Sequence, residues 1–195
     1  MKPKTCILKG VNVNELERAY DKCLVWFYAN PNSRIGLNEL SKFIKSSKTS
    51  TKQAVELLIR ETFLIRRVIG KSWMLYLNQK HRFNLIKKVP YHLMKIYETE
   101  IIEAVHREVP QARAIILFGS YRWGSDNETS DIDIAVEIVD KKELEIRQLG
   151  IISELGYRKK VKVNIHIFSR KKIEINLFSN IANGIILDGF LEVSP

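Results

Sequence analysis

The feature that most limits the fold of this chain is a polar loop set between two strand-like segments. Ala114–Phe118 is a continuous apolar run of strand length, which is typical of a buried central strand. Gly119 and Ser120 follow it at once, and a polar loop extends from there to residue 130. Residues 131–136 alternate between polar and apolar side chains and then become fully apolar, which predicts a second strand. Polar groups are therefore expected where the first strand ends and where the second begins.

Two aspartates lie at the start of the second strand. Positions i and i+2 of a strand point to the same face, so Asp131 and Asp133 converge while Ile132 and Ile134 turn toward the core. Two carboxylates this close repel each other, and a divalent cation removes that cost. Because carboxylate oxygens suit Mg²⁺, which keeps waters and takes phosphate oxygens as further ligands, the sequence predicts Asp131 and Asp133 as magnesium ligands.

Gly119 and Ser120 supply groups of the opposite kind. A glycine directly after a buried strand lets phosphate oxygens approach the main chain, because it has no Cβ. Main-chain N–H groups at a turn from strand to helix point at anions, and the hydroxyl of Ser120 adds a donor. A triphosphate is therefore expected between these donors and the metal, which is most of what phosphoryl-type transfer requires.

The first half of the chain predicts three helices. Asn14 with Glu17 is a capping pattern for the first helix, which the Asn-Pro-Asn sequence at 30–32 ends. Asn38 is the expected cap of the second helix, and Ser50 opens a capping pattern for the third. The residues expected to face the core from the second and third helices are Leu40, Phe43, Ile44, Ala54, Leu57 and Leu58.

Two strand-like segments follow these helices. Residues 63–69 and 73–77 are rich in β-branched, aromatic and aliphatic side chains, and residues 70–72 are the expected turn between them. Three helices followed by a hairpin, with a short turn before the third helix, resemble a winged helix-turn-helix domain over residues 12–80. The resemblance implies that the third helix enters the major groove of duplex DNA.

The distribution of charge supports the same interpretation. Residues 1–90 hold 18 Lys and Arg against 6 Asp and Glu, a net charge of +12, whereas residues 91–195 hold 14 against 16, a net charge of −2. A basic part that attracts polyanions indicates nucleic-acid binding; the alternative is a basic module that binds protein or only packs. The residues expected to contact DNA from the third helix and the hairpin are Lys48, Ser50, Thr51, Lys52, Gln53, Arg66, Arg67 and Lys71.

The second half of the chain is expected to begin after a polar junction. Residues 78–90 show no clear period, and Pro90 suits the first turn of a long helix with an apolar stripe. Apolar residues at helical spacing predict another helix over 141–156, and clean alternation predicts a strand over 161–167. The tail, residues 173–190, is expected to begin as a helix and then turn.

The loop and its flanking strands match a known pattern. Gly119-Ser120, ten intervening residues and then Asp131-x-Asp133 resemble the DNA polymerase β-like nucleotidyltransferase superfamily, and the surrounding residues are close to its minimal members. The resemblance implies a mixed β-sheet with flanking helices, Mg²⁺ and a nucleoside triphosphate such as ATP. It also implies transfer of a nucleoside monophosphate to an acceptor hydroxyl, with release of pyrophosphate.

One part of the family pattern is missing. The family has a third carboxylate on a neighbouring strand, which helps bind the metal and can take the proton of the attacking hydroxyl, but the non-core face of residues 161–167 carries none. Asn164 is the candidate substitute ligand, whereas His166 is interpreted as an exposed strand residue rather than a base. Glu137 lies about 13 Å beyond Asp133 along the strand, too far to substitute. The loss affects turnover more than nucleotide binding.

The other polar and aromatic residues of the loop have ordinary interpretations. Asp126 and Glu128 are expected to be solvated. Tyr121 and Trp123 are expected either to flank a nucleotide base or to pack the loop, and Arg122 is interpreted as a surface cation.

The whole chain is predicted to be of the α+β class. Its expected parts are a winged helix-turn-helix domain at 1–80, a linker at 81–90 and a nucleotidyltransferase fold at 91–195. Cys6 and Cys23 make no disulfide framework, and neither a signal peptide nor an apolar run of about 20 residues is present, so a cytoplasmic protein without membrane contact is expected.

Three functions stay open. The first is a Mg²⁺-dependent nucleotidyltransferase whose acceptor is a partner protein, as in the family's antitoxins that modify a toxin, or a molecule brought in by the DNA-binding part. The second is a DNA-binding transcriptional regulator with a degenerate nucleotidyltransferase domain that binds nucleotide or only dimerises. Because winged helices often act as dimers, a homodimer is compatible with both. The third, RNA 3′-end modification, ranks last because no aromatic RNA-binding platform is evident.

Overall fold

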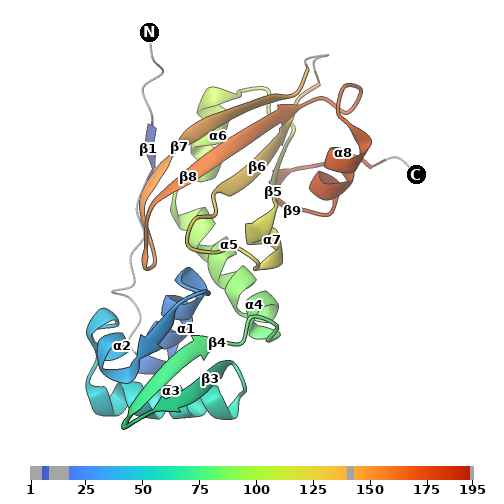
Figure 1. Ribbon diagram of the computed structural model, residues 1–195. Coiled ribbons are helices and arrows are strands. Elements are labelled where there is room, and N and C mark those ends of the chain that lie inside the picture. Colours follow the sequence, from blue (N-terminus) through green and yellow to red (C-terminus); the bar gives the residue numbers. More distant parts are fainter. Residues whose placement is uncertain (1–5, 9–17, 140–142, 194–195) are drawn as a thin grey trace.

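The computed structural model describes residues 6–8, 18–139 and 143–193, which fold into two groups of elements (Figure 1). Residues 18–77 form three helices and a three-stranded sheet at one end of the molecule. A six-stranded sheet with flanking helices occupies the other end, and a run of helices joins the two groups. The structure is therefore a mixed α and β arrangement, as the sequence predicts.

The first group follows the predicted order of three helices and a hairpin, with one short strand added. Its elements are α1 (Ala19–Ala29), β2 (Arg34–Gly36), α2 (Leu37–Phe43), α3 (Lys48–Arg60), β3 (Leu64–Ile69) and β4 (Ser72–Leu77). Strand β2 pairs antiparallel with β4, so the sheet order is β2-β4-β3. The sequence does not predict β2, because three residues are too few to show a strand period.

The helix boundaries differ from the predicted ones in detail. Helix α2 begins after Gly36 rather than at Asn38, and α3 is capped by Ser47, whose Oγ accepts from the Ser50 N–H at 3.0 Å. The predicted cap of the first helix at Asn14 lies outside the described residues. Phe43 and Leu57, both predicted to face the core, are 54% and 38% exposed, since the helices lie turned slightly from the predicted faces.

The residues predicted as a linker are helical. Helices α4 (Phe83–Ile86) and α5 (Lys88–Glu98) cover most of residues 81–90, and the side chains of Phe83 and Val89 are buried. The predicted long helix from Pro90 is instead two helices, because Glu100 adopts a left-handed conformation with φ of 60° before α6 (Ile101–Glu108) begins.

The second group is built on a mixed six-stranded sheet of order β1-β7-β8-β6-β5-β9. Strands β1 and β7 pair in parallel, as do β6 and β8, whereas the other neighbours are antiparallel. Strand β1 lies far from the other strands in sequence and forms one edge of this sheet, beside β7 (Figure 1). The elements are β1 (Cys6–Leu8), β5 (Ala114–Phe118), α7 (Ser120–Trp123), β6 (Ile132–Glu137), β7 (Glu145–Leu155), β8 (Arg158–Phe168), α8 (Ile175–Ala182) and β9 (Ile185–Gly189).

The helix predicted over 141–156 is wrong, since this segment contains the eleven-residue strand β7. A bulge between Gln148 and Gly150 adds Leu149 to the strand, so Leu149 and Ile152 both reach the buried face. Apolar residues three apart resemble a helical period, and the bulge produces that spacing within a strand. After α8 the chain turns at residues 183–184, as predicted, and it then forms the unpredicted strand β9, which pairs with β5.

The large sheet has two apolar faces of different extent. On one face, Ile132, Ile134 and their neighbours pack against α5 and α6 in a large core. On the other face, α8 covers a smaller cluster that includes Ile116 and Ala135. The second face of β8 continues beyond this cover with polar side chains, which leaves an open polar surface over β6 and β8.

Candidate nucleotide site

The end of β5 and the start of β6 bring the two halves of the predicted motif into contact. Phe118 lies opposite Asp133 in the antiparallel pair, so Gly119 is placed beside that carboxylate. Gly119 has φ of 71° and ψ of −151°, a conformation that only glycine adopts readily. A Cβ at this position would lie 3.1 Å from Asp133 Oδ2. The backbone conformation therefore favours glycine strongly, and a Cβ here would also press on the Asp133 carboxylate.

Strand β8 adds two polar side chains to the aspartates. Parallel pairing sets Asn164 opposite Asp133. Asn164 Nδ2 donates to Asp131 Oδ2 at 3.3 Å, and His166 Nε2 lies 3.3 Å from Asp133 Oδ1. The interpretation of His166 as an exposed strand residue is wrong: its side chain is 14% exposed and meets the Phe118 ring edge to face, with centroids 4.9 Å apart.

The donors fit a hard cation that keeps part of its water shell. Asp131 and Asp133 offer carboxylate oxygens on one face, and the Asp133 side chain is 30% exposed. Within the described residues, no group of three or more His, Cys, Asp and Glu is arranged to hold a metal. Glu137 is 2% exposed and already contacts Arg170 Nε at 2.6 Å. Two carboxylates with waters and substrate phosphates would complete a Mg²⁺ shell.

The segment after Gly119 is a short helix rather than the predicted loop. Ser120 begins α7 and is partly exposed beside the glycine. Arg122 Nε donates to the main-chain oxygen of Asn183, and its guanidinium lies over the exposed Trp123 ring at 4.4 Å. Ser120 follows Gly119, which lies beside the Asp133 carboxylate, so its main-chain N–H and hydroxyl are the candidate phosphate donors.

Comparison with known proteins agrees with this geometry. Residues 98–183 match the family model of the nucleotidyltransferase domain. This segment is similar to nucleotidyltransferase domains. The chain is also 40% identical over 48 residues to the protein adenylyltransferase MntA of Shewanella oneidensis, a match that covers 25% of this chain and 34% of that protein. The chain thus matches about a third of the length of this curated relative. No helix in the described ranges is long and apolar enough to cross a membrane.

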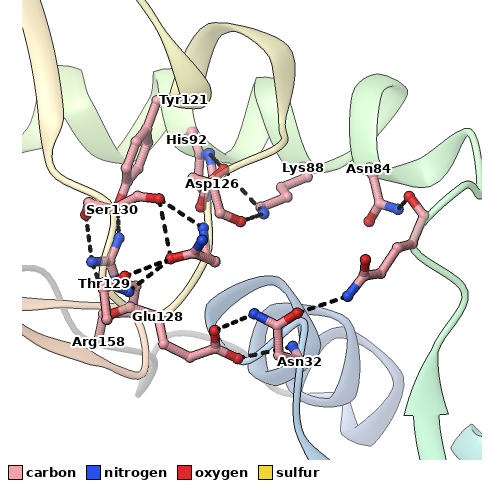
Figure 2. Close-up of polar contacts among 12 residues, drawn as sticks. Asn32, Asn84, Lys88, His92, Tyr121, Asp126, Glu128, Thr129, Ser130 and Arg158 are labelled. Carbon is pink, nitrogen blue, oxygen red and sulfur yellow. Dashed lines mark hydrogen bonds and ion pairs between the residues drawn. The ribbon is translucent and has the colours of Figure 1, made fainter.

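The loop between α7 and β6 holds a buried ion pair that the sequence did not reveal. Asp126, predicted to be solvated, is 1% exposed. Lys88 Nζ, equally buried, lies 3.0 Å from Asp126 Oδ1 and donates to the Asp126 main-chain oxygen at 2.8 Å (Figure 2). His92 Nδ1 lies 3.5 Å from the same carboxylate oxygen. The available signal in the sequence was Lys88 and His92, which lie four residues apart and therefore on one side of α5, among apolar residues.

Burial controls the ionisation of these groups. It lowers the pKa of Lys88 and raises that of Asp126, while the opposite charge of each partner acts against the shift. Burial also lowers the pKa of His92 well below 6.5, and the nearby Lys88 adds to the effect. His92 is therefore a neutral ring, packed against Tyr121 with centroids 4.6 Å apart.

Two further contacts hold the loop. Glu128, also predicted to be solvated, accepts from the Asn32 main-chain N–H at 2.9 Å and from its Nδ2 at 2.8 Å, which ties the loop to the first group (Figure 2). Arg158 donates to the Tyr121 hydroxyl and to the main-chain oxygens of Glu128 and Ser130. Tyr121 is 1% exposed, which leaves only the packing interpretation for its ring.

Four of the eight predicted DNA contacts lie around one exposed groove, outside the residues that match the family. Lys48, Lys52 and Lys71 line a groove of about 380 Å³ together with Trp73. The Arg66 guanidinium lies over the Trp73 ring at 4.5 Å, and Ser50, Gln53 and Arg67 are exposed nearby in the chain.

Thr51 does not belong to that surface. It is fully buried, and its Oγ1 donates to the Ser47 main-chain oxygen at 2.8 Å. The prediction that Thr51 contacts DNA is therefore wrong: the helix turns this side chain inward.

Proposed function

We propose that the chain is a Mg²⁺-dependent nucleotidyltransferase that moves AMP from ATP to an acceptor hydroxyl. The observation that carries the proposal is the contact between the two motif halves, in which Gly119 lies against the carboxylate of Asp133. This contact supports the proposal because it brings the proposed phosphate donors next to the proposed metal ligands. The cytoplasm, which supplies ATP and Mg²⁺, is the expected compartment.

The roles of the residues follow from this placement. Asp131 and Asp133 would hold Mg²⁺, which when bound neutralises charge on the triphosphate and on the departing pyrophosphate. The Gly119 segment leaves room for phosphate oxygens at the main chain, and Ser120 donates to them. The acceptor oxygen forms a bond to the α-phosphorus as the bond to pyrophosphate breaks, and the hydroxyl proton passes to solvent water. Positioning of the reactants supplies most of this catalysis. Two carboxylates are enough to bind the nucleotide together with its metal.

A protein hydroxyl is the acceptor that we propose. The similar protein is named a protein adenylyltransferase, which supports both AMP as the transferred group and a protein as its acceptor. A toxin–antitoxin pair, in which this chain modifies a toxin partner, is the biological setting that we propose for it.

Titration calorimetry of ATP in the presence of Mg²⁺ tests the site. Wild type is expected to bind, and Asp133→Asn to lose binding because a metal ligand becomes neutral. Asp188→Asn is the matched control, since Asp188 lies on the surface strand β9 and pairs only with His106 within the described structure. Absence of binding by wild type would reject the nucleotidyltransferase proposal.

Duplex DNA binding is the second function that we propose, through residues 18–77 as a winged helix-turn-helix domain. The predicted domain bounds of 1–80 are too wide, because β1 pairs with β7 in the large sheet. The cationic groove beside Trp73 supports it, together with the +12 charge of residues 1–90. In this form the chain is a transcriptional regulator, active as an enzyme or with a degenerate nucleotidyltransferase domain that senses nucleotide or mediates a homodimer.

A gel shift with duplex DNA over a series of salt concentrations tests whether the chain binds DNA. Lys52→Gln and Lys71→Gln are each expected to weaken binding and to reduce the slope of log affinity against log salt by about 1. Lys172→Gln, an exposed lysine of the other group, is expected to leave both unchanged. No binding by wild type at low salt would reject the regulator.

A further inference from the structure

A single arginine side chain joins the two halves of the nucleotide motif. Arg158 begins β8, and its Nη1 donates to the hydroxyl of Tyr121, the residue that follows Ser120. Its Nη2 donates to the Ser130 main-chain oxygen at 2.5 Å and to the Glu128 main-chain oxygen at 3.2 Å. Ser130 directly precedes Asp131. The guanidinium thus connects the residue after the phosphate-binding pair to the residue before the first metal ligand (Figure 2).

The acceptors of Arg158 are fixed in place. Tyr121 is 1% exposed and packs on the neutral ring of His92, so its hydroxyl has little freedom to move. Burial raises the pKa of Tyr121 strongly, and the hydroxyl stays protonated and accepts from the guanidinium. The planar guanidinium offers several N–H donors in a rigid fork, which lysine cannot reproduce. One such fork can set the distance between two segments of main chain.

The loop is restrained at a second point that differs in kind. Glu128 receives its side-chain hydrogen bonds from Asn32, in an exposed contact with the first group. These bonds end at a side chain, two residues further from Asp131 than the Ser130 oxygen. Arg158 is therefore the described side chain that acts on the main chain directly beside the metal ligand.

We infer that Arg158 is a positioning residue, which holds the main chain of residues 128–130 so that Asp131 stays in register with Asp133 and Gly119. The inference rests on the proposed nucleotide site. Groups that orient a metal ligand without touching the metal typically change metal affinity or activity by about 10- to 100-fold when removed. Loss of Arg158 should act on the Mg²⁺ dependence of ATP binding, because Asp131 is the ligand displaced.

The test is titration calorimetry of ATP over a series of Mg²⁺ concentrations. Arg158→Gln is expected to raise the Mg²⁺ concentration for half-maximal binding by about 10- to 100-fold. Arg158→Lys should show a smaller shift, because an ammonium can reach one carbonyl oxygen but cannot bridge to Tyr121 as well. The matched control is Arg147→Gln, since Arg147 lies exposed on β7 and pairs with Glu108 and Glu145.

The outcomes separate the inference from the function on which it rests. If Arg158→Gln keeps the wild-type Mg²⁺ dependence and only lowers the number of binding sites per chain, Arg158 stabilises the fold alone and the inference is wrong. If Arg147→Gln raises the Mg²⁺ concentration for half-maximal binding as much as Arg158→Gln does, the effect is not specific to Arg158. The inference is then again wrong. If wild type binds no ATP at any Mg²⁺ concentration, the proposed function itself fails.

Discussion

At the scale of single residues, a comparison of Gly119 with Gly70, both at positive φ, separates the cost of the backbone conformation from the cost of crowding. A Cβ at Gly119 would lie 3.1 Å from Asp133 Oδ2, whereas a Cβ at Gly70 would meet no atom within 4 Å. Each alanine variant is expected to lose about 1–3 kcal/mol of stability from the backbone alone. Only Gly119→Ala should also weaken ATP binding, by tenfold or more. Calorimetry of both folded variants measures this, and equal ATP affinities would contradict the proposed contact.

The buried His92 predicts a pH dependence of stability. Its pKa in the folded chain lies well below 6.5, so between those values the unfolded chain binds a proton that the folded chain does not. Stability from this group is full above pH 6.5 and falls as pH decreases, by up to about 1.4 kcal/mol per pH unit. We expect the free energy of unfolding, measured with urea at pH 5 to 7, to depend less steeply on pH in His92→Gln than in wild type. The exposed His106→Gln is the control, and a slope unchanged in His92→Gln would refute the assignment.

At the scale of elements, the cap of α3 distinguishes two neighbouring serines. The sequence favours Ser50, but Ser47 is the residue whose Oγ accepts from a free N–H of the first turn. Ser47→Ala is therefore expected to lower the free energy of unfolding by about 1 kcal/mol. Ser50→Ala removes only the exposed Oγ that accepts from the Ser47 hydroxyl, so it should lower the free energy of unfolding by less. Denaturant unfolding of the pair checks this order, and the reverse order would support the sequence-based cap.

At the scale of the whole molecule, the tip of the β7–β8 hairpin joins the two groups of elements. Tyr157 packs against the core of the first group, and burial raises its pKa to about 12. The preceding Gly156 lies so close that a Cβ would be 2.8 Å from the Tyr91 hydroxyl and 3.4 Å from Val25 Cγ1. This contact, together with Asn32–Glu128, predicts that the groups unfold together.

Calorimetric unfolding tests this coupling. Wild type is expected to unfold in one transition, and Tyr157→Ser to broaden or split it because the hairpin tip no longer fills the first core. Phe190→Ser is the control, since this ring is 65% exposed and removing it leaves the contact intact. Two separate transitions in wild type would show that the groups are independent.

The sequence by itself determined the features that depend on a few neighbouring residues. The apolar run Ala114–Phe118 predicted a fully buried strand, and the structure confirms it. The hairpin β3–β4 was equally evident, because the strand period of two residues can be recognised within each short segment. The same period predicted that Asp131 and Asp133 lie at the start of one strand with Ile132 and Ile134 in the core, which the burial of both isoleucines confirms.

Only the tertiary structure decided the contacts between distant residues. His166 reached Asp133 through the parallel pairing of β6 with β8, 33 residues away in sequence, and Asp126 was buried by a lysine from α5. Strand β7 was hidden because its bulge imitates a helical spacing, and its pairing with β8 overrides that local pattern. Periodicity records which side of its own element a residue faces. What covers that side depends on chain segments that only folding brings together.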